Sequence, residues 1–279
     1  MNTYATLADL RQVLGLTGAQ TQDDDLLLRL VDAASRLIER HTGRRFYPAR
    51  RLHRYTVGDP AILPLRDDLL ALASLTNGDG TPIAPEACHL HPSGGPVWTI
   101  IALDRTRAAF VHTGDPVDAI ALDGTWGYHP DWPHAWAGSG DAVIDDPLAA
   151  DATALSVTDA DGAAGDGSAP RFAVGHLLRV GDEYLHVLAV DAATNVLTVA
   201  RGANGTTAAS HSQGTPIAIY RAPADVRQVC LRVAAWLYKQ KDAGFVQATG
   251  GLRGQIAVPP ALPDDVAQIL APYARVSVA

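Results

Sequence analysis

The stretch "VLTVARGANGTTAASHSQGTPIAIY" (residues 196–220) decides how the middle of this chain folds. Its ends, "VLTVA" and "PIAIY", are short β-branched runs typical of strands. Its centre, "RGANGTTAASH" (201–211), holds two glycines, an arginine, hydroxyls and a histidine. A Walker-type phosphate loop ends in Gly-Lys-Ser/Thr and opens a helix, whereas this centre has no lysine and lies between two strands. We therefore expect a hairpin-like connection with Asn204-Gly205 as its turn.

Composition restricts the class of protein. The chain has 279 residues, 47% of them hydrophobic, and only two cysteines, so a disulfide framework is not expected. We find no apolar run near the ~18 residues of a membrane helix and no signal peptide, and we expect folding in a reducing cytoplasm. Residues 141–220 hold ten acidic residues and three arginines, so this segment carries most of the net charge of −8. Such a balance disfavours a surface built to grip nucleic acid.

Helices are predicted at both ends of the chain. "TLADLRQVLGL" (6–16) begins with Thr6 as N-cap and ends at Gly15. "TQDDDLLLRLVDAASRLIERHTGRRF" (21–46) has aspartates at its start, apolar residues at helical spacing and Gly43 as a stop. A third helix is predicted in 222–244 and, after a glycine-rich gap, a short fourth one begins near Pro263.

Between these helices the period changes to that of strands. Turn pairs such as Asn77-Gly78 and Asp123-Gly124 separate short runs from about residue 46 onward, which predicts a small antiparallel β region. The acidic segment forms a second β unit. We therefore expect an α+β protein with a helical connector core (1–140 and 221–279), a small antiparallel β region and an inserted all-β domain (141–220).

The residues offer no convincing chemistry for an enzyme, a metal or a cofactor. His89 and His91 share a strand face, and His129 and His134 flank Trp132, but no metal-ligand spacing accompanies them. "DADGAAGDG" (159–167) is similar to a calcium loop but lacks the closing glutamate. There is no Gly-x-Ser-x-Gly motif, and neither cysteine lies in a catalytic signature. We expect no enzymatic activity, no catalytic residues, no metal site and no cofactor.

"RHTGRRFYPARRLHR" (40–54) is the one strongly basic stretch, with Arg40, Arg44, Arg45, Arg50, Arg51 and Arg54. One interpretation is a solvated or salt-bridged face. The other is an electrostatic contact with an acidic partner, with passing DNA or with the acidic patch of a neighbouring subunit.

Several stretches in this order resemble the head–tail connector (adaptor) proteins of tailed bacteriophages. They cover about residues 5–130 and 222–276: "TLADLRQVLGL" with "DDDLLLRLVDAASRLIERHTGRRFYP", "DGTPIAPEACHLHPSGGP", "DAIALDGTWGY", "APADVRQVCLRVAAWLYKQ" and "VPPALPDDVAQILAPYARV". In such connectors the segment like Trp126-Gly127-Tyr128 leads almost directly into the helix that starts here at Pro223. The segment that separates them here resembles a small β module of phage tail and baseplate proteins.

The resemblance implies a structural virion protein at the head–tail junction, assembled in the bacterial cytoplasm. It implies a dodecameric ring of this chain under the portal protein, a tail-proximal stopper or tail-completion protein as a second partner, transient contact with genomic DNA in the lumen, and no membrane. Ring closure needs a head-to-tail interface. We name as candidates Arg44, Arg45, Arg50 and Arg51 together with Tyr273 and Arg275.

An alternative is a tail or baseplate protein whose β insert binds a host-surface glycan. Aromatic residues at Trp126, Tyr128, Trp132 and Trp136 could stack on sugars, or they could pack the join between domains.

Overall fold

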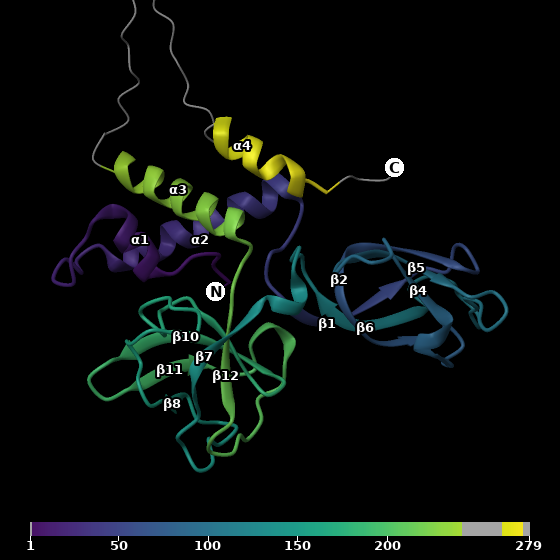
Figure 1. Ribbon diagram of the computed structural model, residues 1–279. Coiled ribbons are helices and arrows are strands. Elements are labelled where there is room, and N and C mark those ends of the chain that lie inside the picture. The colour runs from purple at the N-terminus through teal and green to yellow at the C-terminus, as the bar shows by residue number, and fades with distance from the viewer. Residues whose placement is uncertain (1, 242–263, 276–279) are drawn as a thin grey trace, which may run out of the picture.

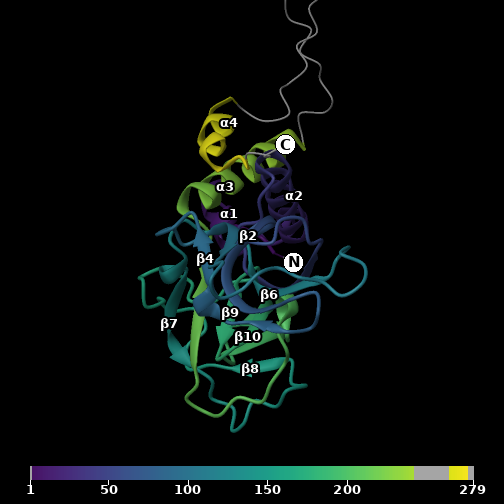
Figure 2. The ribbon, with the colours of Figure 1, turned by 90° about the vertical axis from the view of Figure 1, so that its right-hand side faces the viewer.

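The computed structural model describes residues 2–241 and 264–275, which form a layer of helices above two separate antiparallel sheets (Figures 1 and 2). The helices are α1 (Leu7–Leu14), α2 (Asp24–Thr42), α3 (Ala224–Gln240) and α4 (Asp264–Leu270). Short 3-10 turns are η1 (Pro85–Ala87), η2 (Trp132–His134), η3 (Ala203–Gly205) and η4 (Ala271–Tyr273). The glycine-rich gap expected before α4 lies outside the described residues.

The expected fold class, an α+β protein with a helical core and a small β region, is wrong. The described residues are mostly β, with two antiparallel sheets of six strands each and four short helices. The first sheet is more extensive than the turn pairs predict. Asp123-Gly124, expected to separate two runs, lies inside the strand Ile120–Trp126, and Ile62–Thr76 form a single bent strand that pairs on both sides.

The ends of the first two helices confirm the capping signals. The Thr6 hydroxyl accepts the Asp9 N–H and the Asp9 carboxylate accepts the Thr6 N–H, a reciprocal capping box that satisfies two orphan donors. Gly15 and Gly43 end α1 and α2 in the left-handed conformation, with φ of 69° and 67°. A side chain is strained at such angles, so glycine stops each helix there.

The first sheet comprises β1 (Ala49–Tyr55), β2 (Ile62–Thr76), β3 (Pro82–Ile83), β4 (Cys88–His91), β5 (Trp98–Leu103) and β6 (Ile120–Trp126). Its order is β1-β6-β2-β5-β4, with β3 paired to β2. Its own core contains Leu69, Leu75, Ile101 and Leu122. Trp126 is buried in that core and donates its indole N–H to the Arg51 carbonyl oxygen at 2.8 Å.

The second sheet comprises β7 (Trp136–Ala142), β8 (Ala154–Ser156), β9 (Leu177–Val180), β10 (Glu183–Asp191), β11 (Val196–Ala200) and β12 (Pro216–Tyr220). Its order is β7-β12-β9-β10-β11-β8. The expected hairpin-like connection between β11 and β12 is therefore wrong, because β9 and β10 lie between these two strands. Residues 201–215 cross one end of the sheet instead of reversing the chain between neighbours.

The helices and the second sheet share one apolar core. Leu10, Leu27, Ile38 and Val229 from the helices are fully buried, and the same cluster contains Leu177, Tyr184, Ala203 and Tyr220 from the second sheet. The N-terminal Tyr4 lies in this cluster too, with 3% of its surface exposed. The second sheet also has a core of its own around Leu178, Leu185 and Ile219. The helical layer is thus packed directly onto the second sheet.

Candidate interaction surface

The arginine-rich stretch runs from the last turn of α2 into β1, and the C-terminal segment returns to the same place. The Arg275 backbone N–H donates to the Thr42 carbonyl oxygen at 2.8 Å, and its guanidinium donates to the Leu65 carbonyl oxygen at 2.8 Å. Arg44, Arg45, Arg51 and Arg275 line one small crevice. The structure therefore brings together most of the residues that the sequence named in two stretches more than two hundred positions apart.

The Arg44 guanidinium contacts two residues of the same chain, Asp68 and Tyr128. Its Nη1 lies 2.8 Å from Oδ1 of Asp68, and its guanidinium lies 4.2 Å from the centre of the Tyr128 ring. Asp68 is 3% exposed, and burial raises the pKa of its carboxyl above the usual value although Arg44 and Arg275 lower it. This ion pair fastens the end of α2 to β2.

Arg45, Arg51 and Arg54 point outward. All three are exposed, and none forms an ion pair with a described residue. Arg50 is exposed as well and approaches Asp182 of the second sheet at 3.5 Å. An ion pair this open contributes little free energy, since water screens it. Of the predicted interface candidates, Arg45, Arg50 and Arg51 are therefore the ones that a partner can reach.

Tyr273 serves the internal packing. Its ring lies edge-on to Phe46 and Tyr128, with centroids 5.6 Å and 5.9 Å away. Its hydroxyl donates to Asp225 at the start of α3 at 3.0 Å. Burial and the Asp225 carboxylate raise the pKa of Tyr273 to about 12. Together with Arg275, it fastens the C-terminal segment to the rest of the chain.

The loop 201–211 is built around a buried carboxylate that the sequence analysis did not single out. Glu183 is 1% exposed and accepts hydrogen bonds from the Arg201 guanidinium through Nε and Nη2, both at 2.8 Å. The backbone N–H groups of Gly202 and Ala209 donate to it at 2.8 Å and 3.1 Å, and His211 Nε2 lies 2.8 Å away. An acidic residue at the very start of a mostly apolar strand, β10, is the signal that could have found it.

These donors set the protonation of Glu183. Burial by itself raises the pKa of the carboxyl, but the hydrogen bonds from Arg201, Gly202, His211 and Ala209 outweigh it and lower the pKa to about 2. Polar groups at the centre of the loop are thus hydrogen-bonded to Glu183 of the same chain. The loop therefore turns at Asn204-Gly205, where the sequence predicts a turn, and presents no phosphate cradle, although the predicted hairpin does not form.

The tip of the loop also holds the second sheet against β1, and we call it the latch (Ala203–Gly205). Asn204 exchanges amide hydrogen bonds with Asn2 at 2.9 Å and donates to the Pro48 carbonyl oxygen at 2.9 Å. Gly205 has a φ of 80°, and a Cβ at that position would lie 2.1 Å from the Arg50 carbonyl oxygen. The close approach of the two sheets here requires glycine.

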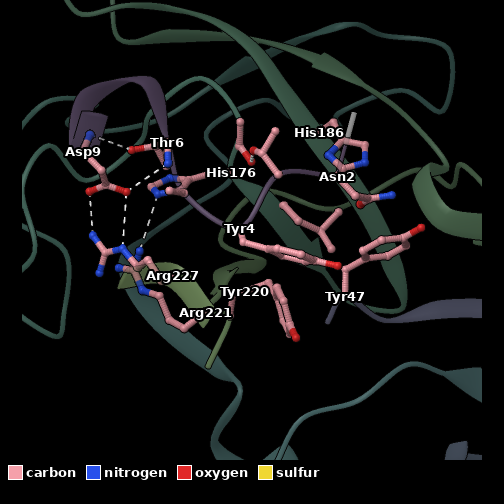
Figure 3. Close-up of a pocket in the computed structure, with 15 residues that line it drawn as sticks. Asn2, Tyr4, Thr6, Asp9, Tyr47, His176, His186, Tyr220, Arg221 and Arg227 are labelled. Atoms are coloured by element: carbon pink, nitrogen blue, oxygen red, sulfur yellow. Dashed lines mark hydrogen bonds and ion pairs between the residues drawn. The ribbon is translucent and has the colours of Figure 1, made fainter. Parts of the chain in front are cut away.

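A pocket of about 40 Å³ lies where the N-terminal segment crosses between the second sheet and α3 (Figure 3). His176 and His186 line it, each 8% exposed, and Asp9 pairs with Arg227 at its rim at 2.6 Å. Burial, then the charge of Arg221, lowers the pKa of His176 to about 3, and burial lowers the pKa of His186 to about 4. A space this size holds one or two waters rather than a substrate.

The remaining residues considered from the sequence are the histidines, the two cysteines and the aspartate-rich segment 159–167. Among residues 2–241 and 264–275, no group of three histidine, cysteine or acidic side chains is arranged to hold a metal ion. Within the same ranges no helix has the length and apolar content to cross a membrane. Asp159 closes its own turn by accepting the Gly162 N–H at 2.9 Å, and Asp166 pairs with Arg221 at 2.9 Å.

Of the aromatic residues considered for glycan stacking, Trp126 and Trp136 pack against other side chains, and Tyr128 and Trp132 are partly buried against the shared core. Trp126 is 3% exposed and stacks on His53, with ring centroids 4.1 Å apart. Trp136 packs on Tyr184 and Tyr220 with centroids 5.0 Å and 5.3 Å away, and Arg179 covers its ring at 4.9 Å. Trp126 thus packs in the core of the first sheet, and Trp136 packs on the core that the helices share with the second sheet.

Comparison with known proteins gives a likeness in structure. No family model and no curated protein matches the chain. A chain from the neck of an empty GTA (gene transfer agent) particle, computed with C6 symmetry, is similar in structure with a TM-score of 0.44 and 14% sequence identity. The match covers 99% of this chain and 92% of that chain. Values this low establish neither family membership nor function.

Proposed function

We propose that this chain is a structural protein of a phage-like virion, a non-catalytic head–tail adaptor. In this proposal its copies form a ring, of twelve subunits by the connector resemblance, beneath a portal. A tail-proximal stopper or tail-completion protein binds below, and genomic DNA passes through the lumen.

The observation that carries the proposal is the convergence of the connector-like stretches. Four of the five stretches that resemble connectors, at 6–48, 118–128, 222–240 and the described part of 258–276, meet around Phe46, Tyr128 and Tyr273. The fifth, 79–96, lies in the first sheet. The four are separated in sequence by the acidic β segment but are contiguous in space. A shared fold unit predicts this contiguity, whereas chance similarity of scattered stretches does not.

The deciding experiment is the mass of the purified protein with and without a cognate portal, by light scattering and negative-stain imaging. We expect a ring, either alone or on the portal. A monomer that ignores the portal contradicts the proposal and favours the glycan-binding alternative, which binding to a glycan array would then test.

The arginine variants for virion assembly follow from the geometry. Arg44→Glu reports on folding, since it places two carboxylates together at Asp68. Arg45→Glu instead changes an exposed side chain without an internal ion pair. We expect it to lower particle yield while leaving thermal stability unchanged. Unaltered yield and infectivity would remove Arg45 from the interface.

A further inference from the structure

The surface around β1 carries positive charge that the described residues do not neutralise. We call it the β1 surface (Arg45, Arg51, Leu52 and Arg54). Its three arginines are exposed without ion pairs; Arg54 and the 57% exposed Leu52 lie on one face of β1, and Arg51 lies on the other. One unpaired carboxylate, Asp123 opposite Leu52 on β6, offsets part of this charge. A groove of about 380 Å³ lies beside it, lined by Leu52 and Arg54. Its other charged residues are already paired, Arg66 with Asp118 and Asp67 with Arg275.

The complementary charge lies at the far end of the second sheet. We call it the acidic end (Asp145, Asp146, Asp161 and Asp191). Asp191 pairs with Val196 in the register of β10 and β11, and Val196 pairs with Ser156 of β8. Ser156 donates to the Asp145 carboxylate, and the Ala160 N–H donates to Asn195 beside Asp191. None of the four aspartates forms an ion pair with a described residue.

The two surfaces of one molecule are held apart. Strand β11 begins at the acidic end with Val196 and runs to Ala200, next to the latch that touches β1. Its length separates the two ends by roughly 13 Å at about 3.3 Å per residue, and the latch adds to this distance. Because the latch fixes one end of the sheet to β1, the acidic end cannot turn back onto the β1 surface of the same chain.

We propose that the β1 surface binds the acidic end of a second copy of this chain. Unpaired arginines face unpaired aspartates, and the exposed Leu52 suits a protein surface better than a phosphate backbone. The contact joins two different surfaces, which is the head-to-tail geometry that closes a ring. This inference rests on the proposed function for its biological setting and gives the second sheet a role in assembly.

Charge exchange tests the contact. Variant A is Arg51→Glu with Arg54→Glu, and variant B is Asp146→Arg with Asp161→Arg. All four side chains are exposed and none has a hydrogen-bonding partner among the described residues. Light scattering over a concentration series should show self-association weakened about tenfold or more in each variant, since like charges then face each other.

Mixing the two variants is the sharper measurement. The glutamates of A then face the arginines of B, and the arginines of B's β1 surface face the aspartates of A. We expect the mixture to regain the association of the wild type. The control, Arg29→Glu with Arg105→Glu, makes the same charge change at exposed arginines elsewhere and should associate normally. Circular dichroism confirms that each variant is folded.

Unchanged association in either variant overturns the inference. So does a mixture that fails to recover, or a wild type that stays monomeric at every soluble concentration. Loss of duplex-DNA binding in variant A with an unchanged mass would assign the surface to nucleic acid and also overturn it. Portal binding is measured separately, so an adaptor that binds its portal but shows no charge exchange keeps the proposed function and loses this contact.

Discussion

At the scale of single residues, the most consequential side chain is Glu183, a buried carboxylate that accepts hydrogen bonds from Arg201, Gly202 and Ala209. Its partner Arg201 is 6% exposed and donates also to the carbonyl oxygens of Ala149, Ala152 and Ala209. One ion pair thereby joins two loops to the start of β10 at one end of the second sheet. Such a pair is costly to break because removing either member leaves the other buried and unpaired.

Glu183→Gln is therefore expected to lower the free energy of unfolding by about 3–5 kcal/mol. The amide keeps the shape of the side chain but removes the charge opposite Arg201 and turns an NH₂ group toward donors. Urea denaturation measures the change. Asp182→Asn, at a side chain that is 96% exposed, is the matched control and should change stability by less than about 0.5 kcal/mol. Equal effects at the two positions would show that the buried pair is not decisive.

The buried histidines make stability depend on pH. The pKa values of His176 and His186 are lowered to about 3 and about 4, below the ordinary value of 6.5. At pH values between the lowered and the ordinary pKa, these two histidines therefore bind protons in the unfolded chain and not in the folded chain. Stability is complete above pH about 6.5 and falls as the pH drops toward 4, by up to about 1.4 kcal/mol per pH unit for each histidine.

His176→Asn should flatten this slope. The amide oxygen can replace the acceptor that the imidazole presents to the Ala173 N–H. Urea denaturation at several pH values from 7 to 4 measures the slope, with His134→Asn as the exposed control. A slope that is the same in both variants would mean that His176 is not the titrating group.

At the scale of elements, the local signals predicted the helices well and the strand pairing poorly. Thr6, Gly15 and Gly43 act through hydrogen bonds and φ angles within a few residues, so a sequence pattern reveals them. The β11–β12 connection depends on two strands that insert between its ends, which the loop itself does not encode. The same limit explains β2, whose single bent path is set by pairing with both β5 and β6.

The latch gives a test at this scale. Gly205→Ala forces a side chain into the left-handed region and against the Arg50 carbonyl oxygen, whereas Gly214→Ala meets the same φ strain with nothing within 4 Å. We expect Gly214→Ala to cost about 1–2 kcal/mol and Gly205→Ala a further 1–3 kcal/mol. Chemical denaturation of the pair isolates the contact between the sheets. Identical costs would show that β1 yields to the added methyl group.

At the scale of the whole molecule, the shared core couples the helical layer to the second sheet. Leu177 of β9 is 5% exposed and lies in the cluster with the helix residues, while Leu188 of β10 is 53% exposed. We therefore expect a substitution in the second sheet to destabilise helices that are distant from it in sequence.

Leu177→Ala should cost about 2–5 kcal/mol and lower the temperature at which the helices melt, as followed by far-UV circular dichroism. Leu188→Ala removes the same atoms from an exposed site and should leave that temperature nearly unchanged. If the helix signal of Leu177→Ala melts as in the wild type, the helical layer is stable without the second sheet.

The sequence by itself determined the helices, their caps, the acidic character of residues 141–220, the β structure there and the turn at Asn204-Gly205. These features depend on periodicity, charge count and backbone angles over short stretches. Tertiary structure decided which members of the arginine stretch are internal, because the partners of Arg44 and Arg275 lie on β2. It also decided that Glu183 closes the loop and that the sheets outweigh the helices. Such outcomes depend on contacts between distant segments, whose partners no local pattern specifies.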